Sequence, residues 1–170
     1  MKIDLKATDI RLANTKVEDI GQIIEFEKSN NQFIGSYSKE HHARLVNDQN
    51  CLHLSVRTLR DDQLVGHVIL LGLMSEHKVL EFKRIAISAK GKGYGRQTIQ
   101  LIKKICFELL KFHRLWLDVF DDNSRAFRLY ESEGFVQEAL LRENIKTDKG
   151  YRSLRIYSIL KPEYIKSNRI

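Results

Sequence analysis

The segment KGKGYGR at residues 90–96 decides the fold, because it connects an apolar run to an amphipathic stretch. Its three glycines stand at alternate positions, and without a Cβ their backbone N–H groups can turn toward one point. The helix expected to follow would direct the positive end of its dipole to the same point, where Lys90, Lys92 and Arg96 add charge. A plain tight turn is the alternative, but the flanks and the charges favour a loop that binds a phosphate or pyrophosphate.

Two common phosphate-binding motifs do not fit this loop. A Walker loop has the form GxxxxGK followed by Ser or Thr, whereas the segment here is shorter and lacks the hydroxyl residue. A dinucleotide-binding loop has the form GxGxxG, whereas residues 91–95 read GxGxG. The segment also follows a series of antiparallel-looking strands and not the first strand of a βαβ repeat.

The residues before the loop predict two helices among several strands. We expect a strand near residues 10–12, a helix that begins with the capping-box pair Thr15 and Glu18, a short helix capped by Ser38, and strands at 52–57, 64–74 and 79–87. The last of these strands changes its alternation at Ile85-Ala86-Ile87, which indicates a β-bulge or a change of facing.

The residues after the loop complete a mixed α/β fold. We expect a helix with one apolar face from Ile99 to Leu110, a strand at 115–120, a helix capped within 121–124 and ended by Gly134, and strands at 135–141 and 151–160 around a turn at 147–150. The predicted architecture is one mostly antiparallel central sheet flanked by helices, and residues 1–170 are predicted to form a single domain.

Composition excludes several classes of protein. The chain has 170 residues, of which 42% are hydrophobic and 30% charged, with one proline and nine glycines, so a collagen-like or disordered chain is excluded. The longest apolar run, residues 68–74, is far shorter than the roughly 18 residues of a membrane span, and the N-terminus has no apolar signal region. Cys51 and Cys106 lack metal-ligand spacing, so we expect no metal and a reducing cytoplasm.

The net charge of +7 is unevenly distributed. Residues 1–85 carry twelve Lys and Arg against twelve Asp and Glu, so the whole excess lies in residues 86–170. A basic half indicates an anionic partner such as nucleic acid, a membrane surface or a phosphorylated small molecule, although a solvated basic surface explains the charge equally well. Nucleic acid is disfavoured, because the aromatic residues are not interleaved with the basic ones and no helix-turn-helix or zinc pattern is present.

Two segments carry a family resemblance. Residues 90–95 are similar to the Q/R-x-x-G-x-G/A motif of the GNAT superfamily of N-acetyltransferases, with Lys90 in the place of the usual Gln or Arg. Residues 123–135, NSRAFRLYESEGF, resemble a second motif of that family, N-x-x-A-x-x-x-Y-x-x-x-G-F. The predicted order of elements also matches the family, so the resemblance covers nearly the whole chain.

The resemblance implies acetyl-CoA as co-substrate, with no metal. The loop amides would hold the pyrophosphate and the edge of the preceding strand would pair with the pantetheine arm. The implied cofactor-binding residues are Ile85, Ala86, Ile87, Gly91, Lys92, Gly93, Tyr94, Gly95, Arg96, Asn123 and Tyr130. The implied reaction is direct acetyl transfer to a primary amine in a ternary complex, the acceptor being a polyamine, another small amine or a protein N-terminus.

The reaction needs a proton acceptor and a proton donor, because an alkyl amine is mostly protonated at pH 7 and the departing thiolate gains from a proton. Tyr130 is predicted to be the acid, with a packed core aromatic as the alternative. Glu81 is predicted to be the base, with a surface ion pair or catalysis by water as alternatives. Four histidines, His41, His42, His53 and His67, remain further candidates.

Substrate, activity and assembly stay open at this point. A polyamine would need several carboxylates, which Glu25, Glu27, Glu40 and Glu81 could supply. A different class of function, either a non-catalytic acetyl-CoA sensor or a basic nucleic-acid-binding module, is the alternative to an enzyme. An exposed sheet edge could also serve as the seam of a homodimer.

Overall fold

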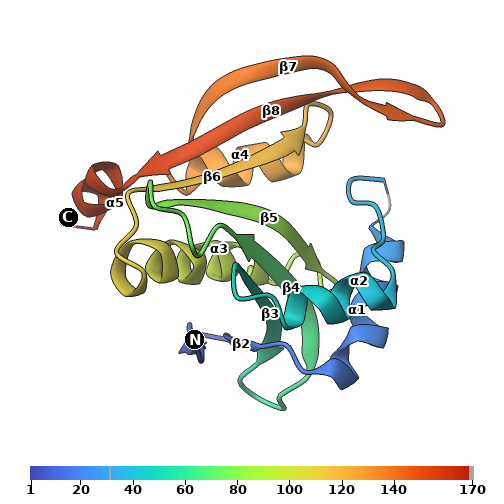
Figure 1. Ribbon diagram of the computed structural model, residues 1–170, viewed down its shortest axis with the longest axis vertical. Helices are drawn as coiled ribbons and strands as arrows, with labels where there is room; N and C mark the ends of the chain where they lie inside the picture. The colour runs from blue at the N-terminus through green and yellow to red at the C-terminus, as the bar shows by residue number, and fades with distance from the viewer. Residues whose placement is uncertain (31, 169–170) are drawn as a thin grey trace.

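A computed structural model describes residues 1–30 and 32–168, which form one twisted eight-stranded sheet with helices against it (Figure 1). The strands are β1 (Asp4–Lys6), β2 (Ile10–Asn14), β3 (Cys51–Thr58), β4 (Leu64–Leu71), β5 (Val79–Ile87), β6 (Arg114–Phe120), β7 (Val136–Thr147) and β8 (Gly150–Leu160). The helices are α1 (Ile20–Ser29), α2 (Lys39–Val46), α3 (Tyr94–Lys104), α4 (Ser124–Ser132) and α5 (Lys161–Ser167). The sheet order is β1-β2-β3-β4-β5-β6-β8-β7.

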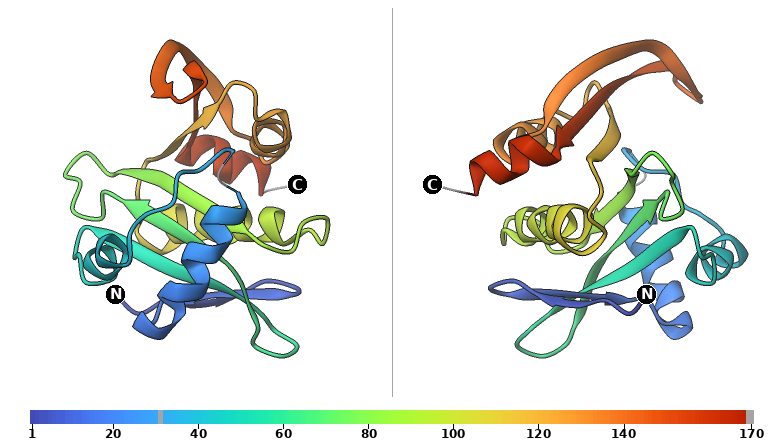
Figure 2. Two further views of the ribbon diagram at one scale, coloured as in Figure 1. Left: turned by 90° about the vertical axis from the view of Figure 1, so that its right-hand side faces the viewer. Right: turned by 60° about the vertical axis from the view of Figure 1, so that its left-hand side comes forward.

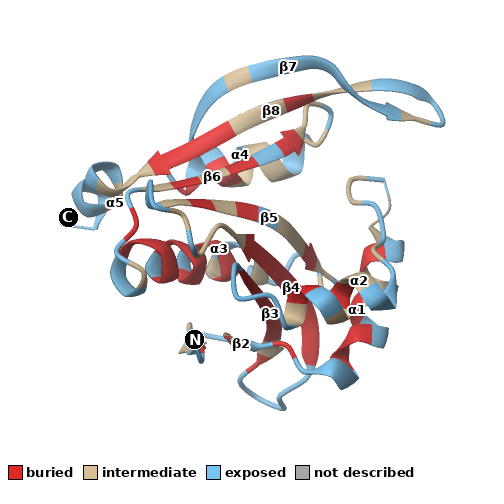
Figure 3. Ribbon diagram, viewed as in Figure 1, coloured by how far each residue is buried: buried red, intermediate tan, exposed pale blue. Residues whose placement is uncertain are grey.

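The two central strands β3 and β4 are buried on both faces (Figure 3). Leu52, Leu54 and Val68 belong to the main core, which α3 completes with Ile99 and Ile102. The opposite face of the same strands meets α1 and α2, and it carries both apolar and polar side chains. Figure 2 shows the sheet lying between α3 on one side and α2 on the other.

A fork between β5 and β6 is the feature that creates a site. The two strands pair in parallel only over Val79–Glu81 and Arg114–Trp116, and then run apart (Figure 1). On its other side β5 stays paired with β4, with one register shift at which Lys83 is the extra residue. Beyond residue 81, β5 therefore presents an unpaired backbone edge toward the fork.

The predicted fold class is confirmed, since all other strand pairs of the described residues are antiparallel and the element order from β2 to β8 is the expected one. The β-bulge is present, but at Lys83, just before the predicted segment. Ser38 caps α2 through His41 N, and Gly134 follows α4 with a φ of +88°.

Five details differ from the prediction. Strand β1 and helix α5 were not predicted, and β7 continues to Thr147 instead of ending at Leu141. The capping box at Thr15 and Glu18 is wrong: a 3₁₀ turn at Val17–Asp19 precedes α1, and the Thr15 hydroxyl lies 2.9 Å from His53 Nδ1. The apolar helix face also ends early, because a π-helical turn at Ile105–Leu109 leaves Leu109 exposed.

Candidate active site

The fork between β5 and β6 opens into the principal cavity of the described residues, about 970 Å³ in volume. Its walls come from β5, the loop before α3, the start of α4, the end of β6 and the loop between α1 and α2. Segments far apart in the sequence thus meet at one place, which is typical of a ligand site in a sheet opened by diverging strands.

The glycine-rich loop, predicted to bind a phosphate, forms one wall of this cavity. Gly91 and Gly93 have φ angles of +84° and +76°, and a Cβ added at either position would meet no protein atom within 4 Å. These left-handed positions favour glycine, and the open space beside them leaves the backbone accessible. Gly93 is also the N-cap of α3, so the amides of the first helical turn lie at the cavity.

Helix α4 directs a second N-terminus to the same cavity. Asn123 caps it, accepting a hydrogen bond from Ala126 N at 3.3 Å, and both residues line the wall. Four basic residues of the two helix starts line the cavity as well: Lys90, Arg96, Arg125 and Arg128. Two helix dipoles and three cations without an ion pair among the described residues, Lys90, Arg125 and Arg128, give this part of the cavity a positive character that favours a polyanion.

Most of the predicted cofactor-binding residues lie together here. The cavity is lined by Ile85, Ala86, Ile87, Gly91, Gly93, Tyr94, Gly95, Arg96, Asn123 and Tyr130. Lys92 is the exception, because its side chain is exposed outside the lining. The Arg96 guanidinium pairs with Glu133 at 2.5 Å and donates to the Ser132 hydroxyl, so it ties α3 to the end of α4.

Tyr130 forms the floor of the fork. Its ring is buried and meets Phe82 edge-on, with ring centroids 6.0 Å apart. Burial, and then the negative charge of Asp118, raise the pKa of the Tyr130 phenol well above its usual value. The hydroxyl is therefore protonated throughout the physiological range, which suits a proton donor.

Asp118 is a candidate that the sequence analysis missed. It lies on β6, is exposed, and lines the cavity, and the ion pairs of the described residues include no partner for it. The signal was available: Leu115, Leu117 and Val119 alternate inward, which turns Asp118 to the other face, twelve residues before Tyr130.

The predicted base and the predicted histidines lie elsewhere. Glu81 is outside the cavity lining, and its carboxylate pairs with Lys83 Nζ at 3.1 Å. Both His42 and His53 are buried between the sheet and α2, and His67 is buried beside them on β4. Cys106 is buried, and burial raises the pKa of its thiol to about 12, which argues against a cysteine nucleophile.

The loop between α1 and α2 lines the remaining part of the cavity with Asn30, Phe33, Ile34, Gly35 and Tyr37. The charged groups around it are largely paired: Lys83 with Glu81, Arg84 with Glu27, and Asp122 with Arg152. Asp118 is the carboxylate of this group without an ion pair, and its negative charge acts on Lys83.

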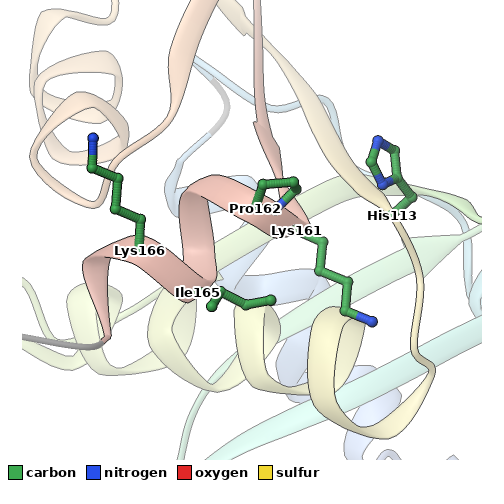
Figure 4. A pocket seen from close by; sticks show the side chains of 5 residues that line it. All are labelled: His113, Lys161, Pro162, Ile165 and Lys166. Atoms are coloured by element: carbon green, nitrogen blue, oxygen red, sulfur yellow. The ribbon is translucent and has the colours of Figure 1, made fainter.

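A second, shallower depression of about 420 Å³ lies against α5 and is lined by His113, Lys161, Pro162, Ile165 and Lys166 (Figure 4). It contains no residue of either sequence motif and no carboxylate. The chemistry is therefore assigned to the fork.

The model of the "Acetyltransferase (GNAT) family" matches residues 18–135. The chain belongs to this acetyltransferase family. The predicted family is thus confirmed, and GNAT enzymes take their acetyl group from acetyl-CoA. Among curated relatives, the chain is 33% identical over 103 residues to spermidine N(1)-acetyltransferase of Vibrio cholerae, covering 60% of each chain. It is 28% identical over 126 residues to the probable N-acetyltransferase YjcK of Bacillus subtilis, covering 73% of this chain and 69% of that one.

The solved structures extend the likeness over nearly the whole fold. A mutant form of the spermidine/spermine N-acetyltransferase of Vibrio cholerae superimposes with a TM-score of 0.82 and 25% identity, covering 94% of this GNAT chain and 98% of that chain. A dodecameric spermidine N-acetyltransferase from the same organism gives a TM-score of 0.80 and 26% identity, over 93% and 97% of the two chains. The sequence match spans about three fifths of the first curated relative, so the amine that this chain acetylates is a matter for proposal.

Proposed function

We propose that this chain transfers the acetyl group of acetyl-CoA directly to a primary amine of a small molecule. The observation that supports this most is the fork between β5 and β6, which joins a polyanion site to an unpaired carboxylate and a buried phenol in one cavity. Family membership supports the acetyl donor.

The described residues fit acetyl-CoA. Gly91 and Gly93 leave the space beside the loop open, and the amides there, with the starts of α3 and α4, would hold the pyrophosphate. The free edge of β5 at residues 85–87 would bond the amides of the pantetheine arm as an added strand would. An N–H of that edge would also stabilise the oxyanion that develops during transfer.

Proton handling is assigned to two residues. The acceptor amine arrives as an ammonium ion, and Asp118 would bind it and accept its proton directly or through water. The free amine then attacks the thioester carbonyl, the C–N bond forms and the C–S bond breaks. Tyr130 would give its proton to the departing thiolate and take up the proton that the new amide nitrogen loses, and Asp118 would return the ammonium proton to water. We propose Asp118 in place of Glu81, because Glu81 is paired with Lys83 outside the cavity lining.

A polyamine is the first candidate acceptor. The relatives that acetylate spermidine, by their names, support it, and so does the unpaired carboxylate of Asp118 in the cavity lining. The carboxylates expected to bind several ammonium groups do not line the cavity, these being Glu25, Glu27, Glu40 and Glu81. A mono- or diamine is therefore expected to bind nearly as well as a longer polyamine.

A thiol-release assay with acetyl-CoA tests the function. The acceptors would be spermidine, putrescine, amino acids, aminoglycosides and peptides with free N-termini, and acetyl-CoA binding would be followed by calorimetry. Turnover with small-molecule amines but not with peptides supports the proposal in full. Tight acetyl-CoA binding without any turnover would favour a sensor, and absence of binding would contradict the proposed function.

Self-association is also proposed, with β7 as the seam. Strand β7 is the outer strand of the sheet and exposes Val136, Leu140, Leu141 and Ile145. One relative is described as a dodecamer, which supports assembly. Light scattering of the wild-type chain and of Leu140→Lys would test it, the substitution being expected to reduce the particle mass.

A further inference from the structure

Glu27 is a fully buried carboxylate outside the cavity lining. Its side chain, on α1, is 0% exposed. Oε1 lies 3.0 Å from Arg84 Nη1 and 3.1 Å from His67 Nε2, while Oε2 lies 3.2 Å from His42 Nε2 and accepts a hydrogen bond from Tyr37 N at 2.8 Å. These partners come from β5, β4, α2 and the α1–α2 loop, so four parts of the fold meet at one carboxylate.

The carboxylate is charged in the folded protein. Burial alone would raise its pKa, but the close nitrogens of His42 and His67, the Tyr37 N–H and the charge of Arg84 outweigh burial and hold the pKa of Glu27 well below its usual value. A buried ion pair is on average no more stabilising than apolar packing of the same volume. Stability alone therefore does not account for a charged carboxylate at this position.

Glu27 holds part of the cavity wall from behind. Arg84, its partner, also donates to the Gly35 carbonyl oxygen, and its guanidinium lies 3.7 Å from the centroid of the Tyr37 ring. Arg84, Gly35 and Tyr37 all line the cavity; we call these three residues the acceptor wall. Two of them belong to the loop and one to β5, so their relative position depends on the bonds that Glu27 makes to Arg84 and to Tyr37 N.

Glu27 is itself tied to the sheet through its neighbour His42. His42 Nδ1 lies 2.9 Å from His53 Nε2, and His53 Nδ1 lies 2.9 Å from the Thr15 hydroxyl, which also accepts a hydrogen bond from Ser55. All of these side chains are buried. A chain of bonded groups in a packed interior leaves Glu27 little freedom to move.

We infer that Glu27 is a positioning residue for the acceptor site: through Arg84 and Tyr37 N it fixes the acceptor wall beside the fork between β5 and β6. The inference rests on the proposed acetyl transfer. A wall that is held rigidly presents a pre-formed surface to the amine, whereas a loosened wall must be ordered when the amine binds, which weakens acceptor binding. Acetyl-CoA binding, at the glycine loop, is independent of these contacts.

The test compares Glu27→Gln with Glu25→Gln. Both residues lie on α1, but Glu25 is exposed and pairs only with Lys28, at 2.8 Å, among the described residues. In Glu27→Gln the KM for the best acceptor of the panel is expected to rise about 10- to 100-fold, with kcat and acetyl-CoA affinity within about threefold of wild type. Glu25→Gln is expected to match the wild type in all three quantities.

Two more variants separate positioning from folding. Tyr37→Leu removes the ring beside Arg84 at the cavity surface without disturbing the buried carboxylate, and it is expected to raise acceptor KM in the same direction. In Glu27→Gln/Arg84→Gln the buried charges are removed together. That double variant is expected to recover thermal stability while its acceptor KM stays high, because the wall lacks its guanidinium.

The outcomes are distinct. An unchanged acceptor KM in folded Glu27→Gln would overturn the inference, as would a wild-type KM in the double variant; if Glu27→Gln does not fold, an unchanged KM in Tyr37→Leu overturns it. A wild-type protein that neither binds nor acetylates any amine would overturn the proposed function and this role together.

Discussion

At the scale of single residues, Tyr130 gives the sharpest expectation. Its phenol is buried in the cavity wall and retains its proton, so the hydroxyl group can donate that proton. Tyr130→Phe keeps the ring and its contact with Phe82, and kcat is expected to fall about 10- to 1,000-fold with acetyl-CoA affinity nearly unchanged. Steady-state kinetics and calorimetry measure both.

A matched control for Tyr130→Phe is Tyr164→Phe. It removes a phenol on α5 that donates a hydrogen bond to Glu108 in the π-helical turn after α3, and Tyr164 does not line the cavity. It should leave turnover at the wild-type value. Unchanged turnover in Tyr130→Phe would remove Tyr130 from the mechanism.

Asp118 and Glu81 are competing candidates for the base, and their substitutions are expected to have different effects. Asp118→Asn is expected to lower kcat/KM for the acceptor about 100-fold, because the unpaired carboxylate that would bind the ammonium and take its proton is lost. Glu81→Gln breaks only a partly exposed ion pair with Lys83 and should cost little. The reverse result would restore Glu81 as the base. Asp121→Asn controls for the loss of a negative charge, because it breaks an ion pair with Arg155 directly after β6.

At the scale of elements, the sequence predicted what local periodicity encodes. The alternation of β3 and β6, the Ser38 and Asn123 caps and the glycine-rich loop were all recognisable, because each depends on neighbours in the chain. The fork was not predictable from periodicity, since it depends on where β6 stops pairing with β5. The Thr15 cap failed for a similar reason: its hydroxyl is bound by His53, 38 residues away.

The residues of the candidate site differ in the same way: some are recognisable from their neighbours in the chain, and others depend on distant residues. Tyr130 and the loop were found through motifs, whereas Glu27 was named only as one of four carboxylates that could bind a polyamine. Its partner Arg84 is 57 residues away, and no pattern within α1 indicates that they meet. Such pairs become visible only when the packing of α1 on the sheet is known.

The glycine-rich loop gives the prediction that belongs to this scale. Gly93 has a φ of +76° and is the N-cap of α3, so Gly93→Val must adopt a left-handed backbone that costs on the order of 1–2 kcal/mol, and its side chain would extend into the open cradle. Acetyl-CoA affinity is expected to fall at least about tenfold, measured by calorimetry on folded protein.

Gly21→Ala is the control, since a Cβ there meets nothing and α1 is an ordinary helix. It should stabilise the protein by about 0.5–1 kcal/mol and leave binding unchanged. Wild-type acetyl-CoA affinity in Gly93→Val would mean that the loop does not hold phosphate.

At the scale of the whole molecule, the two faces of the sheet have different tasks. The face under α3 is apolar and supplies the continuous core, whereas the face under α1 and α2 holds a buried polar network of histidines around Glu27. The network joins the α1–α2 loop to the central strands, and Arg152 of β8 reaches the same loop from the other side of the fork, donating to the Gln32 carbonyl oxygen at 2.7 Å. The loop that would bind the acceptor is therefore held by contacts to both halves of the sheet.

This network predicts how the stability of the whole fold depends on pH. Burial, and then the neighbouring charges of His67 and His42, lower the pKa of His53 from 6.5 to about 3. The unfolded chain takes up a proton at His53 below pH 6.5 and the folded chain does not, so stability is fully present above pH 6.5 and is lost as the pH falls toward 3. By pH 5 the loss from His53 alone amounts to about 2 kcal/mol. His67, whose pKa is also lowered by burial, acts in the same direction, and Glu27 adds its own loss only below about pH 4.5.

Urea unfolding at pH 7.5 and pH 5.0 measures this effect. In His53→Gln the difference in unfolding free energy between the two pH values is expected to shrink by about 2 kcal/mol relative to wild type. His77→Gln, on an exposed turn between β4 and β5, should retain the full wild-type difference. If His53→Gln is too unstable at pH 7.5 to compare, ring-proton NMR of the wild type decides instead. A His53 ring that titrates near pH 6 would contradict the lowered pKa, and a ring that stays neutral to pH 5 would support it.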